Sequence, residues 1–408
     1  MKRDRTYMKI CMTSFSNLPL DARIQKEAAS VLAAGHEIVL IGFAKNISQK
    51  KIFQEHNFRQ IWYPFIEMAN NSAWQRLRRV LSALQVGIQI YWTTLLTGAD
   101  VYHSHEAYPL PACFLAAKLR GKKIVYDAHE LYQNDGWLGT STLERLFIHK
   151  LDAVINVNEA RADVLRQRYG IAEQTVVMNC PSKTIPSRSG RLRQMFNVPS
   201  QDYVVIYHGG FYPKERALDE LIRAVPRLPN GVHLVILGFD SKGTKAVLQQ
   251  LVTDLSLSDR VHIMDPLPPN ELVEFSTGAD IGVIPQILAS DNQRFANPNK
   301  LFDYMASQLA VVATDAPTIT PIVRGFSIGE IFANPRAEEI ADAIMKLLRD
   351  PAYLRACKQS ARKAAEQVFF WEREEEKLTT LYLRLQSPNQ DWLSGARAYS
   401  NDVQKITK

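Results

Sequence analysis

The sequence predicts an α/β protein built from two Rossmann-like domains that face a central cleft. Short apolar runs alternate with helical stretches, and this alternation starts afresh in the second half of the 408 residues. The two series are separated by a polar, basic stretch rich in Ser and Pro, from Pro181 to Pro199. Alternating strands and helices favour parallel sheets covered on both faces, with ligands at the carboxyl ends of the strands.

In the first half, apolar runs predict strands, and helical stretches that end at glycine predict helices. We expect strands at 9–13, 37–43, 101–103, 123–126, 153–157 and 175–178, and helices at 21–34, 111–119 and 159–169. In the second half we expect strands at 203–207, 233–237, 260–264, 281–285 and 310–313. Helices are expected at 217–224, 244–255, 270–276 and 337–348, and one more begins at Pro298.

These elements give an N-terminal domain at residues 1–185, a linker at 186–199 and a C-terminal domain at 200–370. The segment 371–408 follows. Residues 361–385 are expected to form two helices broken near Phe369, and residues 386–408 lack a strong period and are expected to be loosely ordered.

Positive charge is concentrated in the first half of the chain. Residues 1–185 carry 23 Lys and Arg against 16 Asp and Glu, whereas the remainder carries 26 of each kind. A basic half predicts an anionic partner, such as a membrane surface or a phosphorylated acceptor. Nucleic acid is disfavoured, because the basic residues do not alternate with aromatics and no zinc-finger or RNA-binding motif occurs.

The cysteines indicate a reducing compartment, and we expect a cytoplasmic protein. They are far apart, without a Cys-x-x-Cys pair or a cluster with His: Cys11, Cys113, Cys180 and Cys357. The apolar run 10–15 is too short for a signal peptide and predicts a first strand instead.

Residues 80–99 contain no charged residue and follow the cationic Arg76, Arg78 and Arg79. Three interpretations are open for this segment: a buried amphipathic helix, contact with a membrane surface, or a membrane span. Its polar residues and two glycines favour the buried helix over the span. The basic cluster beside it leads us to expect peripheral binding to an anionic membrane.

The run from Asn297 to Ala306 predicts a helix start suited to an anion. Asn297 is a favourable N-cap and Pro298 a favourable first helical residue. Free N–H groups and the helix dipole favour phosphate there, and Lys300 adds a cation. Asp303 lies on the same face as Lys300, where it could accept hydrogen bonds from a ribose. A helix cap with a local Lys–Asp pair would explain the same pattern.

Other polar residues lie at expected strand ends and loops. His103 and His105 are two apart, so their side chains point the same way if the strand continues. We select His105 as the histidine that contacts the transferred sugar or the acceptor, and Glu130 as a second acceptor-side residue, although Glu130 could instead cap the following helix. Asn292 and Arg294, expected in a loop, are candidates for donor contact.

Together these pieces resemble the family 4 retaining glycosyltransferases, whose architecture is GT-B, over residues 8–386. The resemblance rests on several motifs in order: Asp21–Ala28, Val101–Glu106, Tyr126–Tyr132, Tyr207–Gly210, Glu215–Ile222, Pro298–Ala306 and Trp371–Glu372. It implies a nucleotide-sugar donor bound by the second domain, an acceptor on the first, and a last helix that returns to the N-terminal domain. Asn299, in the Pro-Asn-Lys run, joins Asp303 as a residue for the donor ribose or sugar.

The chain departs from the family pattern at some positions. The usual Glu-x7-Glu signature falls here on Phe295 and Asp303, so the carboxylate expected at the donor sugar is absent. A basic residue usual after the first donor-domain glycine is replaced by Gly210, and the later Lys-Gly pair is Arg216-Ala217. These changes leave the substrate open.

No Asp-x-Asp occurs in the chain, so no metal and no cofactor are expected. The leaving diphosphate must then be neutralised by protein groups. We assign this role to Arg216, Lys300 and the backbone at Gly209 and Gly210. Arg216 could instead pair only with Glu220, and the two glycines could form only a tight turn.

The leading hypothesis is a retaining transferase that uses a UDP- or GDP-sugar and a lipid-linked, polysaccharide or other glycan acceptor. A nucleotide-sugar epimerase of the same fold and a non-catalytic nucleotide-sugar-binding protein remain alternatives.

Overall fold

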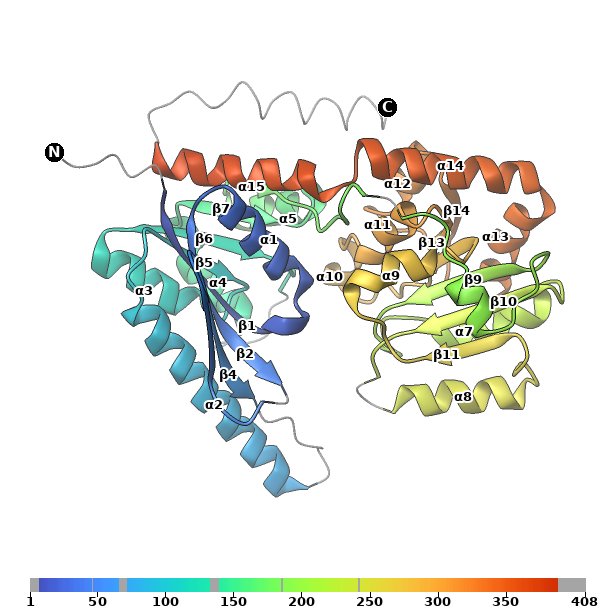
Figure 1. The fold of residues 1–408 in the computed structure, drawn as a ribbon, viewed down its shortest axis with the longest axis horizontal. Helices are drawn as coiled ribbons and strands as arrows, with labels where there is room; N and C mark the ends of the chain where they lie inside the picture. The colour runs from blue at the N-terminus through green and yellow to red at the C-terminus, as the bar shows by residue number, and fades with distance from the viewer. Residues whose placement is uncertain are drawn as a thin grey trace. The chain divides into compact units, whose positions relative to one another are not determined.

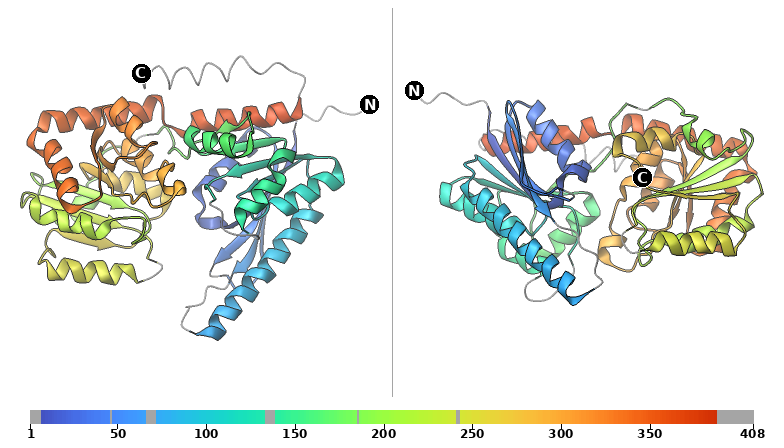
Figure 2. Two further views of the ribbon diagram at one scale, coloured as in Figure 1. Left: turned by 180° about the vertical axis from the view of Figure 1, so that it is seen from behind. Right: turned by 60° about the horizontal axis from the view of Figure 1, so that its bottom comes forward.

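The computed structural model describes residues 7–45, 47–65, 72–132, 139–184, 186–240 and 243–387 (Figure 1). The chain divides into two compact units. The first holds the described residues up to Met178 together with those from Glu374 onward, and the second holds Asn179–Arg373. Each unit is a sheet with helices on its faces, mostly parallel in the first unit and wholly parallel in the second (Figures 1 and 2). The predicted α/β class is therefore confirmed.

The first unit is built on an eight-stranded sheet of order β3-β4-β2-β1-β5-β6-β7-β8. Every neighbouring pair is parallel except β3 and β4. The strands are β1 (Lys9–Asn17), β2 (Glu37–Lys45), β3 (Lys51–Glu55), β4 (Phe58–Phe65), β5 (Val101–His105), β6 (Lys123–Ala128), β7 (Ala153–Asn156) and β8 (Thr175–Val176). The helices are α1 (Ala22–Ala33), α2 (Ala73–Leu96), α3 (Leu110–Arg120), α4 (Thr140–Phe147) and α5 (Glu159–Tyr169).

The order of the strands reverses at β1, which pairs with β2 on one side and with β5 on the other. Such a reversal opens a crevice at the carboxyl ends of the strands, where open α/β sheets bind ligands. The central strands are apolar and buried on both faces, as Ile10, Cys11 and Met12 show. Burial of this strand fixes the register that brings polar residues to the strand ends.

The second unit is built on a six-stranded parallel sheet of order β11-β10-β9-β12-β13-β14. Its strands are β9 (Tyr203–His208), β10 (Val232–Leu237), β11 (Val261–Met264), β12 (Ile281–Ile284), β13 (Ala310–Thr314) and β14 (Gly329–Phe332). Its helices are α6 (Arg191–Met195), α7 (Leu218–Ala224), α8 (Thr244–Asp254), α9 (Pro269–Ser276), α10 (Asp291–Arg294), α11 (Asn299–Ala306), α12 (Thr320–Gly325), α13 (Ala337–Arg349) and α14 (Pro351–Gln367). Here the order reverses at β9, between β10 and β12.

The last helix, α15 (Trp371–Gln386), joins the first unit from Glu374 onward, as the resemblance implied. The Glu374 carboxylate accepts a hydrogen bond from the backbone N–H of Met178 at 2.7 Å, and Ser30 donates to Glu375 at 2.6 Å. The break before α15 lies where the sequence predicted it. The preceding helix α14 ends at Gln367, and Phe369 is buried there against Phe302 and Phe326.

Several expectations from the sequence differ from the structure. The antiparallel pair β3–β4 was not predicted, and α14 begins at Pro351, capped by Asp350, rather than near residue 361. The stretch 186–199, expected to be a linker, contains α6 and lies within the second unit. Leu192 of α6 is buried and Arg193 pairs with Asp280 at 2.7 Å, so this stretch is packed. The tail at 388–408 lies outside the described residues.

Helix α2 contains the uncharged segment 80–99 almost completely. Val86 and Ile90 are buried against the sheet, whereas Leu84 and Ile88 are each 58% exposed. The favoured interpretation as a buried amphipathic helix therefore holds for one face of α2 only, because the other face is exposed. No helix in the described part of the chain is long and apolar enough to cross a membrane.

Candidate functional site

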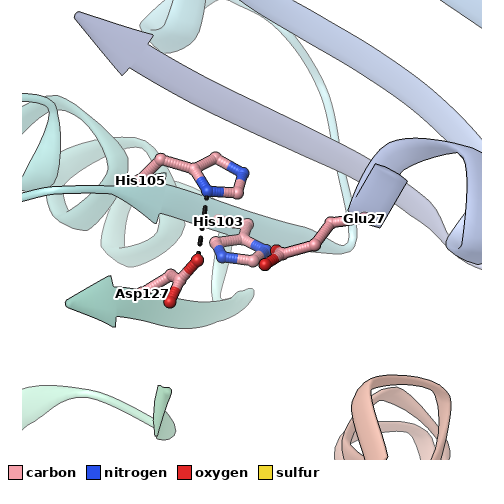
Figure 3. Close-up of side chains that lie close together, drawn as sticks. All are labelled: Glu27, His103, His105 and Asp127. Carbon is pink, nitrogen blue, oxygen red and sulfur yellow. Dashed lines mark ion pairs between the residues drawn. The ribbon is translucent and has the colours of Figure 1, made fainter. Parts of the chain in front are cut away.

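Six charged or ionisable side chains meet at the carboxyl ends of β5 and β6. We call this group the histidine cluster; its members are Arg23, Glu27, His103, His105, Asp127 and His129. Figure 3 shows four of them converging from α1, β5 and β6. All except His129 are buried. A buried charged group of this size needs internal partners, so its hydrogen bonds describe the site.

Local structure explains how these residues meet. His103 and His105 alternate along β5 and share one face, as predicted, and their rings stack with centroids 4.2 Å apart. Arg23 and Glu27 are four residues apart on α1, which places them on one face of the helix. Asp127 lies directly opposite His105 in the parallel pairing of β5 and β6.

Asp127 is the centre of the cluster. Its carboxylate accepts hydrogen bonds from Nε and Nη2 of Arg23 at 3.0 and 2.9 Å. The same carboxylate lies 2.6 Å from Nε2 of His129 and 3.4 Å from Nδ1 of His105. Arg23 also pairs with Glu27 at 2.9 Å, so the arginine bridges two acidic side chains. Bidentate pairing of this kind fixes orientation as well as charge.

The ionisable side chains of the cluster have pKa values shifted in different directions. Burial would raise the pKa of Asp127, but the charges of Arg23 and His129 hold it well below its usual value. Burial would lower the pKa of His129, but Asp127 raises it to about 9, so this imidazole is cationic at neutral pH. Burial lowers the pKa of His105 and raises that of Glu27 to about 8. Burial also holds the pKa of His103 well below its usual value, so the site places one cationic histidine, His129, beside two neutral ones.

The residue types of the cluster are also those of metal ligands. Glu27, His103, His105 and Asp127 each offer one ligand atom, and these atoms lie within 4.8 Å of one another. Tetrahedral zinc with bonds of about 2.1 Å holds its ligands about 3.4 Å apart, so the side chains would have to close in. A metal would also have to displace Arg23, which already binds both oxygens of Asp127. The geometry fits an ion-pair network better than a metal centre.

Glu106 and Glu130 flank the cluster. Glu106 has φ +70°, a strained value for a residue with a side chain, and strain of this kind accumulates at functional sites. Its carboxylate lies 3.5 Å from Nδ1 of His129, and burial raises its pKa to about 8. Glu130 is exposed. It does not cap the next described helix, α4, whose N-cap is Gly139. Within the described residues, Glu130 therefore caps no helix that follows it.

A second group lies at the carboxyl end of β9 in the other unit. We call it the lysine cluster, and it consists of Tyr207, His208, Gly209, Arg216, Lys300 and Asp303. The Nζ atom of Lys300 lies 4.0 Å from the ring centroid of Tyr207. Nε2 of His208 lies 3.8 Å from the carboxylate of Asp303. The structure thus places the predicted Lys300 and Asp303 of α11 beside the predicted glycine turn.

Gly209 allows this approach. It adopts φ +135°, and a Cβ atom there would lie 3.0 Å from Nζ of Lys300. Only glycine accepts that backbone conformation without strain. Gly210 is also restricted, because a Cβ atom there would overlap the Tyr212 ring. The glycine pair therefore does more than form a turn, since it brings the backbone next to the buried Lys300.

Lys300 is buried, and this decides its electrostatics. Burial lowers its pKa well below the usual value, and the charge of Arg216 lowers it further, while Asp303 partly offsets both. Burial and the charge of Lys300 lower the pKa of His208 to about 3. Burial and Arg216 thus disfavour the charged form of Lys300, and a bound anion would favour that form, so this site suits an anionic ligand. Arg216 pairs with Glu215, at 3.8 Å, rather than with Glu220.

The start of α11 differs by one residue from the prediction. Pro298 occupies the N-cap position, and its side chain makes no capping hydrogen bond to the first turn of the helix. Asn297 is therefore not the cap, and its buried Oδ1 has no hydrogen-bond partner within the described residues. Asn299 is exposed at the first helical position. An uncapped helix start leaves backbone N–H groups for a ligand.

Asn292 and Arg294 belong to the short helix α10, not to a loop as predicted. Ser290 caps that helix by accepting a hydrogen bond from the N–H of Gln293. Arg294 is exposed, and its guanidinium lies 5.9 Å from the centroid of the Phe295 ring. Arg294 therefore lies against Phe295, the position at which the family signature has its first glutamate.

Sequence reasoning missed several residues of both clusters. The family motifs contain four residues of the histidine cluster to which no role was assigned: Arg23, Glu27, Asp127 and His129. His208 of the lysine cluster was also not selected. The spacing of Arg23 and Glu27 by four residues on an otherwise apolar helix face was the available signal. The partnership of Asp127 with α1 has no signal in a single sequence, because the residues are 104 positions apart.

Solved structures of similar shape define the class. Sucrose-phosphate synthase from Thermosynechococcus elongatus has a TM-score of 0.74 at 17% identity, covering 93% of this chain and 100% of that one. HepE of Anabaena in complex with UDP-glucose has a TM-score of 0.68 at 18% identity, covering 92% and 99%. WaaG, a glycosyltransferase involved in lipopolysaccharide biosynthesis, has a TM-score of 0.67 at 16% identity, covering 91% and 99%. The fold is that of the GT-B glycosyltransferases.

Two family models match consecutive parts of the sequence. The model "Glycosyltransferase Family 4" matches residues 25–181, and "Glycosyl transferases group 1" matches residues 189–364. The first match covers the histidine cluster except Arg23, and the second covers the lysine cluster. The chain belongs to the family 4 glycosyltransferases.

The curated relatives share more of the sequence than these solved structures do, at 21% to 29% identity. The D-inositol 3-phosphate glycosyltransferase of Mycobacteroides abscessus is 27% identical over 267 residues, covering 61% of this chain and 54% of the relative. The protein of the same name from Mycolicibacterium smegmatis is 29% identical over 312 residues, covering 71% and 68%. The MMP alpha-(1->4)-mannosyltransferase of Mycolicibacterium hassiacum is 21% identical, covering 58% and 55%. The chain spans about half the length of the first curated relatives that it matches.

Proposed function

We propose that this protein is a retaining glycosyltransferase that takes a sugar from a UDP- or GDP-sugar and transfers it to a glycan or lipid-linked acceptor. The observation that carries the proposal is the position of Lys300 at the start of α11. It is a buried lysine, its Nζ lies 3.0 Å from where a Cβ of Gly209 would be, and the N-cap residue Pro298 makes no side-chain hydrogen bond to the helix. Buried cations and free N–H groups together suit a diphosphate. The names of structural neighbours agree, since HepE was solved with UDP-glucose and with UDP.

The reaction breaks the bond between C1 of the sugar and the diphosphate oxygen, and forms a bond from C1 to the acceptor oxygen on the same face of the ring. The acceptor hydroxyl proton passes to a phosphate oxygen of the leaving nucleoside diphosphate. Negative charge grows on that diphosphate as the bond breaks, and groups placed in advance lower the barrier most. We assign this to Lys300, Arg216 and the backbone of Gly209 and Gly210. Asp303 and Asn299 are assigned to the ribose or sugar.

On the acceptor side, the histidine cluster supplies hydrogen-bond donors. His105 has no exposed surface, and its Nε2 has no hydrogen-bond partner within the described residues. His129, which is 16% exposed at its side chain and lies 3.4 Å from His105, is the accessible histidine. A cationic His129 donates hydrogen bonds and cannot act as a base, which agrees with proton transfer to the leaving phosphate. Glu130, exposed beside it, remains a candidate contact for the acceptor, and Asn292 and Arg294 remain candidates for the donor.

One experiment tests the proposal against its alternatives. The purified protein is incubated with a panel of radiolabelled UDP- and GDP-sugars and a membrane extract, and the products are separated and analysed by NMR. A new glycosidic bond with the donor's anomeric configuration supports a retaining transferase. A changed sugar on an intact nucleotide would instead identify an epimerase. Tight nucleotide binding without any product would identify a non-catalytic binding protein. Melting temperatures measured with UDP and with GDP identify the nucleotide of the donor, because only the nucleotide that binds stabilises the folded protein.

We also propose a cytoplasmic site of action, because the cysteines are free and buried: Cys11, Cys113, Cys180 and Cys357. Unpaired cysteines are typical of reducing compartments. Fractionation of cells that produce the protein tests this, and recovery from an extracytoplasmic fraction would contradict it.

A further inference from the structure

One face of α2 exposes a row of large apolar side chains. The residues succeed one another at spacings of three or four positions, and their exposed fractions run from 48% to 75%. They are Leu77, Leu81, Leu84, Ile88, Trp92 and Leu96, and we call them the α2 ridge. The opposite face, with Val86, Ile90 and Thr94, is buried on the sheet. At 24 residues the helix is about 36 Å long, so the row is extended.

The exposed apolar surface continues onto the start and the body of α3. Tyr108, Leu115 and Leu119 are each about half exposed or more. The two helices are joined, because Tyr91 of α2 donates a hydrogen bond to the carbonyl of Tyr108 at 2.5 Å. Single exposed apolar residues are common on soluble proteins, but a contiguous row on one helix marks an interaction surface.

The charge beside the ridge has one sign. Arg76, Arg78 and Arg79 lie in the first two turns of α2, and the helix contains no Asp or Glu. Within the described residues, none of these arginines forms an ion pair with a carboxylate. Cations at a helix N-terminus oppose the helix dipole, so their position does not serve the stability of α2. Their positive charge therefore lies beside the ridge, where an external anion could be bound.

A basic pocket lies at the other end of the ridge. Its volume is about 320 Å³, and its lining combines Leu96 of the ridge with Lys9, Lys50 and Arg59. Lys9 pairs with Glu37 at 2.5 Å, and Nζ of Lys50 lies 4.9 Å from the ring centroid of Tyr63. Arg59 has no carboxylate partner within the described residues. The ridge is thus bounded by cations at both ends.

We propose that the α2 ridge lies in the interfacial layer of an anionic phospholipid membrane. Its apolar side chains would enter the acyl boundary, while the arginines and the basic pocket bind lipid phosphates. A helix that is apolar on one face and flanked by cations lies in the plane of the interface, and Trp is enriched at that depth. The surface fits lipid better than a second copy of the chain, because α2 offers no carboxylate to meet its own arginines.

The proposal is tested by co-sedimentation of the full chain with vesicles of phosphatidylcholine alone and with phosphatidylglycerol added. We expect binding to the anionic vesicles at low salt and loss of that binding at high salt. The triple variant Arg76→Gln/Arg78→Gln/Arg79→Gln should weaken vesicle binding about a hundredfold, because each lost charge lowers the affinity roughly fivefold. Leu84→Gln/Ile88→Gln should weaken it by about tenfold or more, because less apolar area enters the interface.

Matched variants in the second unit control for net charge and for lost apolar surface. Arg223→Gln/Arg349→Gln/Arg355→Gln removes three exposed arginines, and Met195→Gln/Val247→Gln removes two exposed apolar side chains. Both controls should bind vesicles like the unaltered chain, and melting curves should show that every variant is folded. Absence of binding to anionic vesicles at low salt overturns the proposal. Equal loss in the controls, or a ridge variant that changes only self-association in gel filtration, also overturns it.

This inference does not depend on the proposed transfer reaction, since vesicle binding is measured without donor or acceptor. A protein that binds vesicles but forms no product would retain the membrane surface and lose the transferase assignment. A protein that forms product but does not bind vesicles would keep the transferase assignment and lose the membrane surface.

Discussion

The hydroxyl of Tyr382 lies 2.6 Å from Nδ1 of His103, although the two residues are 279 positions apart in the sequence. This hydrogen bond joins α15 to β5 directly behind the histidine cluster. Both residues are fully buried, so the bond has no competing water. It explains why the last helix belongs to the first unit: the helix supplies the partner for a buried histidine whose own strand cannot satisfy it.

Replacement of Tyr382 by Phe should destabilise the first unit by about 1–3 kcal/mol, because Nδ1 of His103 would be left buried without a partner. Urea unfolding, followed by fluorescence, measures the change. Tyr353→Phe is the matched control, since Tyr353 donates to Glu330 at 3.0 Å in the second unit. Equal stability of Tyr382→Phe and the unaltered protein would contradict this account of α15.

Replacement of Lys300 or of Arg216 by Ala should weaken binding of the nucleoside diphosphate by about 1.5–3 kcal/mol, the range for hydrogen bonds to charged groups. Isothermal titration calorimetry with UDP and GDP measures the loss. Asp303→Asn provides the contrast, because it should impair binding of a nucleoside diphosphate more than binding of free diphosphate. If the Lys300 and Arg216 variants both bound UDP and GDP with unchanged affinity, the lysine cluster would not be the diphosphate site.

Gly209→Ala should weaken nucleotide binding by about tenfold or more. The new Cβ would crowd Nζ of Lys300 at 3.0 Å and would force φ away from +135°. Gly243→Ala is the control, because Gly243 also has a positive φ, of +74°, but a Cβ atom added there would meet no atom within 4 Å. Titration calorimetry on both variants separates backbone strain from crowding. Equal binding by the two variants would show that the approach to Lys300 is unimportant.

The histidine cluster predicts a pH-dependent effect of His129→Gln. The folded pKa of His129, about 9, is raised above its usual value, so its stabilising pair with Asp127 is complete below about pH 6.5 and is lost as pH rises through 9. The substitution should therefore cost up to about 3 kcal/mol at pH 6.5 and much less at pH 10. Urea unfolding at the two values gives the difference, and the same cost at both would contradict the ion pair.

Transfer should persist in excess chelator, because the charge of the leaving diphosphate is assigned to protein groups rather than to a divalent ion. Product formation is measured with EDTA and with added Mg²⁺ or Mn²⁺. Activity that disappears in EDTA and returns with either metal would show that the lysine cluster does not neutralise the diphosphate alone.

The sequence predicted the elements with strong local signals. Helix α5 was predicted with its bounds, since Asn158 caps its start and Gly170, at φ +69°, ends it. The stacking of His103 on His105 followed from the two-residue period of a strand. Elements without such signals were missed, as with β3, whose five residues are all exposed and carry no apolar face to the core.

The sequence by itself determined the alternating pattern and the two sheets, because local periodicity and turn chemistry depend on neighbouring residues. The proximity of Lys300 to the glycine turn was expected only from the family resemblance, since Gly209 and Lys300 are far apart in the sequence. Only the tertiary structure decided which buried charges meet. Arg23 finds Asp127, and Tyr382 finds His103, across more than a hundred positions in each case. A desolvated charge or ring nitrogen takes whichever partner the fold brings within hydrogen-bond distance, and that depends on the packing of helices on the sheet. The tertiary structure also decided which face of α2 is exposed. A single sheet covers this helix, so it can bury only one of its faces and leaves the other exposed.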